Sequence, residues 1–187
     1  MDNGLPANTQ AYRRLLDLVE GSGVTYLKAT PRTVQLGSAT LRVLPSTPGD
    51  TSQNNSSVGV LLSYGPFTAL FTGDAEGEER AYWEAKASLP SISVLKVAHH
   101  GSSNGTDARW LRTTRPRVAV ISVGMNNAYG HPSASTLRAL AAAKAVVYRT
   151  DEDGDITVTV SPGGGFTIRT SESGLARAWP SHRAPRR

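Results

Sequence analysis

The chain has 187 residues, of which 39% are hydrophobic and 19% are charged, and it contains no cysteine. This length suits one domain with its own core, and the composition excludes collagen, a coiled coil and wholesale disorder. Without cysteine, the chain can form no disulfide, thiolate metal site or cysteine nucleophile. It has neither an apolar run long enough to cross a bilayer nor a signal-peptide pattern, so we expect no membrane span.

The net charge of +5 is concentrated near the C-terminus. Residues 175–187 contain no acidic residue and four arginines, which are Arg177, Arg183, Arg186 and Arg187. We expect one domain over residues 1–172 and a basic, disordered tail over residues 173–187. Such a tail can attract phosphate or an anionic membrane, but the composition favours a solvated, disordered terminus.

The order of the predicted elements indicates an α/β fold with a mixed sheet. The first half predicts a helix at 8–20, strands at 24–27, 33–36 and 39–44, a polar loop at 45–57, and a hairpin of strands at 58–64 and 67–72. The second half predicts helices at 76–87, 106–114 and 132–144, buried strands at 92–98 and 118–123, and short strands at 146–148, 156–160 and 166–169.

Polar side chains follow three of these strands, at the point where each strand ends. Asp74 follows the hairpin, His99 and His100 follow the first buried strand, and His131 lies in the loop after the second. Because α/β folds place their sites at the carboxyl ends of strands, we expect these side chains to share one site. Carboxylate and imidazole groups are ligands for Zn²⁺ and Mn²⁺.

Each of these residues also has a purely structural interpretation. Asp74 fits the N-cap of the following helix, the two adjacent histidines fit surface residues or residues that only support ligand-binding groups, and His131 fits a turn before proline. Their occurrence at three strand ends favours a shared site.

Several segments together carry a resemblance to a known family. They are Thr72-Gly73-Asp74, Leu95–Ser102, Val120–Gly124 with Asn127, Tyr129-Gly130-His131-Pro132, Val147–Gly154 with Ile156–Val158, and Asn54–Ser57 before a strand. With them, the chain resembles the metallo-β-lactamase-like domain of ComEC-type competence proteins over roughly residues 2–160.

The resemblance implies an αββα sandwich that hydrolyses phosphodiester bonds of DNA during transformation. It implies that Asp74 and His99 bind one or two Zn or Mn ions. The implied catalytic residues are His100, His131 and Lys96. The implied substrate-binding residues are Ser102 and Asn127.

One departure from the family is large. The principal metal-binding signature of the fold, His-x-His-x-Asp-His, is absent, and no histidine precedes His99. Met1 is therefore expected to begin inside the domain, so that the fold is N-terminally incomplete. The chain is then a shortened domain, a degenerate homologue, or a fragment that another chain completes. A catalytic zinc site needs about three protein ligands and a water. We therefore expect weak or absent metal binding and an activity that is impaired.

Three functions remain open on the sequence alone. The first is a metal-dependent DNA phosphodiesterase of the DNA-uptake type. The second is a non-catalytic module that binds nucleic acid or a partner and has lost its metal. The third is a small-molecule metallo-hydrolase, because one fold hosts many chemistries. Expected partners are DNA and either a membrane channel domain or a chain that completes the fold. The family domain is extracytoplasmic and membrane-attached, whereas this chain shows no signal or span and also fits the cytoplasm.

Overall fold

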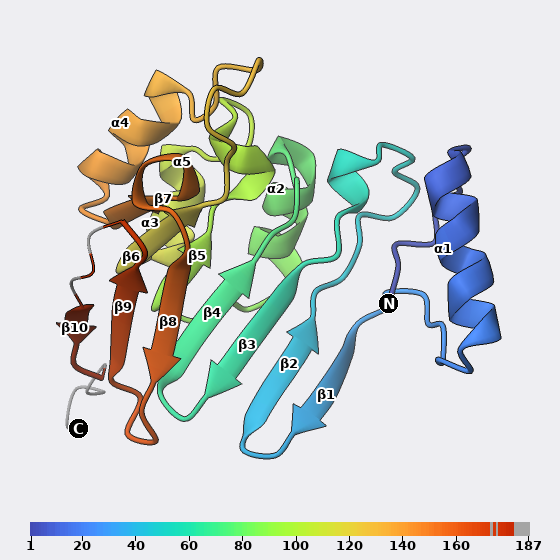
Figure 1. Ribbon diagram of the computed structural model, residues 1–187, viewed down its shortest axis with the longest axis horizontal. Coiled ribbons are helices and arrows are strands. Elements are labelled where there is room, and N and C mark those ends of the chain that lie inside the picture. The colour runs from blue at the N-terminus through green and yellow to red at the C-terminus, as the bar shows by residue number, and fades with distance from the viewer. Residues whose placement is uncertain (173, 175, 182–187) are drawn as a thin grey trace.

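A seven-stranded mixed sheet is the centre of the molecule (Figure 1). The computed structural model describes residues 1–172, 174 and 176–181. The strands lie in sequence order: β1 (Arg32–Leu36), β2 (Ala39–Val43), β3 (Val60–Tyr64), β4 (Phe67–Phe71), β5 (Val94–Lys96), β6 (Val118–Ile121) and β7 (Val146–Arg149). β1 to β4 pair antiparallel, and β4 to β7 pair parallel. The carboxyl ends of β4 to β7 therefore lie at one edge.

Helices cover one face of this sheet, behind it in Figure 1. They are α2 (Gly77–Lys86), α3 (Ala108–Thr114) and α4 (Ala134–Ala142). Asp107 caps α3 by accepting the Trp110 N–H at 2.9 Å, and Ser133 caps α4 by accepting the Thr136 N–H at 3.2 Å. These caps satisfy backbone donors that each helix leaves free at its start, which explains where the two helices begin.

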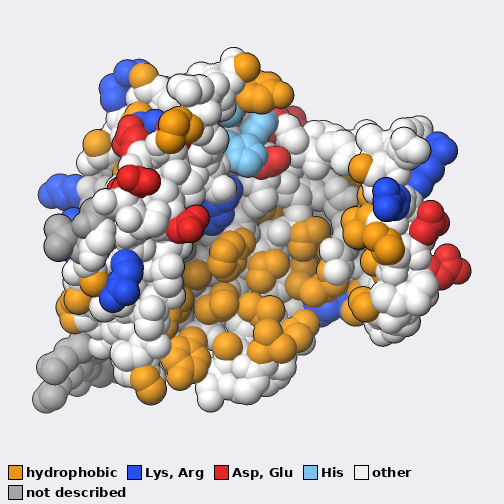
Figure 2. All heavy atoms as spheres, in the orientation of Figure 1, with side chains coloured by type: hydrophobic (Ala, Val, Ile, Leu, Met, Phe, Trp, Pro, Cys, Tyr) orange, Lys and Arg blue, Asp and Glu red, His pale blue; other side chains and the backbone are white. Residues whose placement is uncertain are grey.

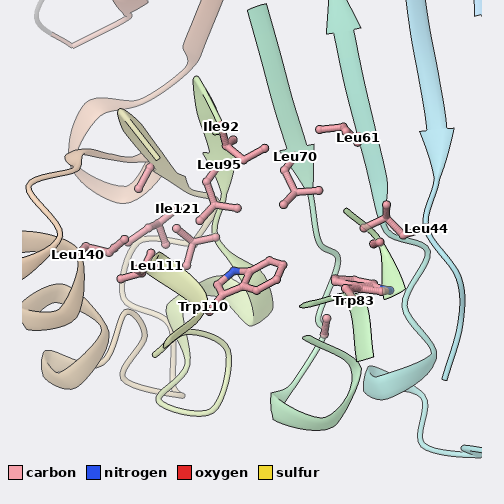
Figure 3. Packing of buried hydrophobic residues seen from close by; sticks show 14 of the residues in the cluster. Leu44, Leu61, Leu70, Trp83, Ile92, Leu95, Trp110, Leu111, Ile121 and Leu140 are labelled. Carbon is pink, nitrogen blue, oxygen red and sulfur yellow. The ribbon is translucent and has the colours of Figure 1, made fainter. Parts of the chain in front are cut away.

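The main core fills the space between the helices and the sheet (Figure 3). Trp83 of α2 and Trp110 of α3 are buried, with ring centroids 6.2 Å apart. Leu70 and Leu95 pack against them from the central strands and have no exposed surface. Burying a large apolar side chain stabilises a fold by about 2–3 kcal/mol. The core between the helices and the sheet therefore holds the carboxyl ends of β4 to β7 in place.

A smaller antiparallel sheet packs on part of the opposite face. It is formed by β8 (Ile156–Val160), β9 (Phe166–Thr170) and β10 (Ala176–Trp179), in the order β10-β9-β8. Phe166 contacts Phe67 of β4 edge to face at 5.3 Å and stacks on Trp179 at 5.2 Å. A four-residue helix, α5 (Thr150–Asp153), joins β7 to β8.

β10 falls within the segment expected to be a tail. It pairs with β9, and its Trp179 is buried because the indole stacks on Phe166. Residues 176–179 are thus a strand of the small sheet and not a solvated extension. Arg183, Arg186 and Arg187 lie outside the described residues.

The small sheet leaves the same face open over β1 to β4, where hydrophobic side chains form a broad surface (Figure 2). Leu36 is 57% exposed there and Phe71 is 46% exposed. A cavity of about 330 Å³ lies where this surface meets β8, and Lys96 is its one charged lining residue. Helix α1 (Gln10–Gly21) lies beyond β1 and has no fully buried residue, and its Leu15 and Leu18 are exposed.

The expected fold class is confirmed: the molecule is α/β, with a seven-stranded mixed sheet, and its layers are compatible with an αββα sandwich. Apart from one predicted strand and the unpredicted α5 and β10, the order of helices and strands also agrees with the sequence prediction. The strand predicted at 24–27 is absent, and the residue after this segment, Lys28, makes one isolated bridge with Asp2. The helix predicted at 8–20 begins two residues later, because Thr9 is its cap.

Candidate functional site

The four residues singled out in the sequence lie at one edge of the sheet. Asp74 follows β4, His99 and His100 follow β5, and His131 lies in the loop after β6. These three strands are parallel neighbours, so the loops that follow them meet. Figure 2 shows histidine side chains gathered beside acidic ones at this end of the sheet.

The distances between these side chains show which of them are neighbours. Asp74 Oδ1 lies 3.6 Å from His100 Nε2. The His99 ring is 6.4 Å from the His100 ring and 5.9 Å from the His131 ring, centroid to centroid. The expectation that Asp74, His99 and His131 gather at one edge therefore agrees with the structure.

The turn that carries His99 and His100 is conformationally unusual. His99 has φ 47° and His100 has φ 52°, so two successive side-chain-bearing residues adopt the left-handed region. This conformation costs about 1–3 kcal/mol for each residue and persists only where other contacts impose it. The His99 N–H donates to Gly73 O at 3.1 Å, and the Ser102 N–H donates to His99 O at 2.8 Å. Such strain is concentrated at functional sites, which favours a role beyond packing for both imidazoles.

The His100 ring is oriented by a backbone carbonyl. Its Nδ1 lies 2.7 Å from Ser122 O, and because a carbonyl only accepts, Nδ1 carries the proton. In the neutral imidazole, Nε2 is then an acceptor and faces the Asp74 carboxylate, which also accepts. Two acceptors that face each other need a positive charge or a hydrogen-bond donor between them. The His100–Asp74 pair is therefore suited to hold a proton on Nε2, a cation, or a donor group of a ligand.

The structure adds Glu76 and Asn54, which sequence reasoning did not place in the site. Glu76 Oε1 lies 3.4 Å from His99 Nδ1 and accepts a hydrogen bond from Asn54 Nδ2 at 2.8 Å. His99 Nδ1 is buried and makes no hydrogen bond, so Glu76 contacts it at ion-pair distance only. Asn54 lay in a segment that carried the family resemblance, whereas Glu76 was only the first residue of the helix predicted at 76–87.

The polar loop at 45–57 also supports Asp74. The Asp74 N–H donates to Ser57 Oγ at 3.0 Å, and the Ser57 N–H donates to Glu79 Oε2 at 3.0 Å. A methyl group on Gly73 would lie 2.9 Å from the Ser57 side chain, so a glycine is needed there for the two segments to approach. Asp74 is held through its backbone by this contact, which leaves its carboxylate directed to His100.

The loop that carries His131 is braced by Asn127. The Asn127 amide donates to Gly124 O at 3.1 Å and to His131 O at 2.7 Å, and it accepts the His131 N–H at 3.0 Å. These contacts make Asn127 a positioning residue for His131, while its expected contact with substrate stays a prediction. Tyr129 stacks on the His131 ring at 5.9 Å.

The environment of His131 favours its neutral form. Burial, and then the neighbouring His99 and His100, lower the pKa of His131. Its Nδ1 is buried and has no hydrogen-bond partner. The His131–Pro132 peptide bond is cis.

Lys96 and Ser102 lie beside the site in different environments. Burial lowers the pKa of Lys96, and the Asp74 carboxylate partly offsets this by raising it, while Lys96 Nζ donates to Val97 O at 3.0 Å. Ser102 is 8% exposed, and its carbonyl accepts the Thr136 hydroxyl at 2.9 Å. Ser102 thus fixes the site to α4, and its expected role in substrate binding stays a prediction.

The potential ligands do not converge on one point. Over residues 1–172, 174 and 176–181, no group of three or more His, Asp or Glu side chains is arranged to hold a metal ion. The Asp74–His100 pair and the Glu76–His99 pair each supply two donors. Two donors fall short of the three or four that a zinc site uses. The described residues alone therefore do not fit a complete metal centre.

No family model matches the chain. Three curated proteins are similar to it at modest identity. ComE operon protein 3 of Bacillus subtilis is 38% identical over 114 residues, which are 60% of this chain and 14% of the relative. Recombination protein 2 of Haemophilus influenzae is 35% identical over 107 residues, which are 57% of this chain and 13% of the relative.

The third is Competence protein ComA of Neisseria gonorrhoeae, 31% identical over 122 residues, which are 64% of this chain and 18% of the relative. The chain thus spans less than a fifth of the length of each relative that it matches. Within the described part of the chain, no helix is both long and apolar enough to cross a membrane.

Proposed function

We propose that this chain is a hydrolase domain of the DNA-uptake type that acts on DNA phosphodiester bonds, with its site at the edge that carries Asp74, His99, His100 and His131. The observation that carries the proposal is the convergence of these side chains from three neighbouring parallel strands. The names of the relatives, which refer to competence and recombination, support DNA as the substrate class.

Imidazole groups suit chemistry at a phosphodiester. A protonated histidine stabilises the negative charge on a phosphate oxygen, and a histidine near neutral pH transfers a proton to a leaving oxygen. His100, with Nδ1 fixed by Ser122 O, presents Nε2 toward Asp74 and so has a defined orientation for either role. Lys96 adds a cation whose ammonium is partly desolvated, and we assign it a supporting electrostatic role.

We further propose that Zn²⁺ or Mn²⁺ binds this chain weakly. Asp74 and His99 are the proposed ligands, with His100 as an alternative. Asp74 pairs with His100, whereas His99 pairs with Glu76. Each pair supplies only two ligands, which compensate the ion for its lost water ligands less well than a full set of three or four does. We assign no reaction step to the metal.

A second candidate function is a non-catalytic nucleic-acid-binding module. The observation that favours it is the lack of any three-ligand cluster in the described part of the chain. Both functions place DNA at the same edge, and they differ in whether the bond is cleaved.

Elemental analysis and cleavage of a labelled oligonucleotide with added Mn²⁺ separate the two. We expect substoichiometric metal and slow cleavage that a chelator stops. Asp74→Asn should abolish that cleavage, whereas Asp17→Asn, a change on the exposed helix α1, should not. DNA binding that His99→Gln weakens, without any cleavage, would favour the binding module. Absence of both binding and cleavage would refute both functions.

A further inference from the structure

The loop between β6 and His131 exposes two large apolar side chains next to the candidate site. Met125 is 74% exposed and Tyr129 is 83% exposed. In the view of Figure 2, hydrophobic side chains lie beside the histidines at this end of the molecule. Exposed apolar groups that gather beside polar groups commonly mark interaction sites.

The loop that presents Tyr129 is fixed. Asn127 binds both ends of the loop, through Gly124 O and through the backbone of His131. The Tyr129 ring lies nearly parallel to the His131 ring, with an interplanar angle of 20° and centroids 5.9 Å apart. The aromatic surface is therefore positioned before a ligand arrives, which reduces the entropy lost on binding.

The rings of Tyr129 and His131 are also continuous with the candidate site. The His131 ring lies 5.9 Å from the His99 ring, so an aromatic run extends from exposed Tyr129 to the edge where Asp74 and His100 pair. The loop from 124 to 133 contains no acidic residue, so it does not repel a phosphate. The site thus offers a stacking surface beside imidazoles. A ligand that carries a flat apolar ring next to an anionic group matches this arrangement.

A nucleotide has this combination of groups. Every nucleobase has a flat face that stacks on an aromatic side chain, and the base is accessible only where the strand is unpaired. We propose that Tyr129 stacks on an unpaired nucleobase next to the phosphate bound at the histidines, so that this site takes single-stranded nucleic acid. This inference rests on the proposed function, because it needs the phosphate to lie at that edge.

Binding of short oligonucleotides to the 187-residue chain tests the inference. The probes are fluorescein-labelled hexathymidylate, an abasic hexamer of the same charge, and a duplex of the same length. Loss of stacking by Tyr129→Ala should weaken binding of hexathymidylate about 5- to 150-fold, while binding of the abasic hexamer stays unchanged. Tyr129→Trp should retain the affinity. Tyr26→Ala, a change at another exposed tyrosine, is the matched control and should alter neither affinity.

The outcomes separate this inference from the proposed function. If the wild-type chain binds neither hexamer, both are refuted. If it binds the two hexamers equally well, or if Tyr129→Ala weakens both to the same extent, the stacking is refuted and the phosphate site is retained. Binding of the duplex as tightly as hexathymidylate would refute the preference for single strands.

Discussion

Glu79 is a single buried side chain that supports the site and makes the stability of the fold depend on pH. Its side chain is fully buried, and its Oε2 accepts the Ser57 N–H. Its Oε1 has no hydrogen-bond partner. Ser57 in turn accepts the Asp74 N–H, so Glu79 lies behind Asp74. Burial raises the pKa of Glu79 to about 8, the hydrogen bond from Ser57 lowers it, and the charge of Asp50 raises it further.

Stability should therefore fall as the pH rises from about 4.5 to 8. The folded chain holds the Glu79 proton through this range, whereas the unfolded chain releases it near pH 4.5, so the stabilisation is complete below 4.5 and is lost toward 8. The loss is about 1.4 kcal/mol for each pKa unit that separates the two states. Glu79→Gln should remove this dependence in urea unfolding measured at several pH values. The same slope in Glu79→Gln and wild type would contradict the raised pKa.

At the scale of the elements, much of the candidate site was predictable because its residues follow buried strands. The apolar runs before Asp74, His99 and His131 indicate strands, and parallel strands bring their ends together. The supporting contacts of Asn54, Ser57 and Glu76 were not predictable, because they join a loop to a helix start 20 or so residues away. Trp179 was missed for a related reason: its strand pairs with β9, and its ring stacks on Phe166 of that strand.

The two ends of β4 allow a matched test of the layered fold. Phe67 is 3% exposed and packs on Phe166, whereas Phe71 is 46% exposed on the open face. We expect Phe67→Ala to lower the free energy of unfolding by about 3–5 kcal/mol, the usual cost of truncating a buried phenylalanine. Phe71→Ala should cost about 1 kcal/mol or less, because water already contacts its ring. Equal losses in urea unfolding would show that the face over β1 to β4 is covered in solution.

At the scale of the whole molecule, we expect positive charge and the candidate site to be two separate sources of affinity for DNA. The site offers imidazoles, whereas arginines dominate the end of the chain. A chain that ends at Ser181 keeps β10 but lacks Arg183, Arg186 and Arg187. Binding of single-stranded DNA by this shorter chain should be weaker. The slope of log affinity against log salt should decrease in magnitude by about 2, since each phosphate contact contributes about 0.7. An unchanged slope would show that these arginines do not contact DNA.

The central claim is that the side chains at the ends of β4, β5 and β6 form one phosphodiester-binding site, and the histidine NMR signals test it most directly. The chain has four histidines, and His99→Gln, His100→Gln and His131→Gln would assign three of them. During titration with a thymidine dinucleotide, the imidazole signals of His99, His100 and His131 should shift together with one dissociation constant. Signals that stay fixed, or that shift with different dissociation constants, would contradict a shared site.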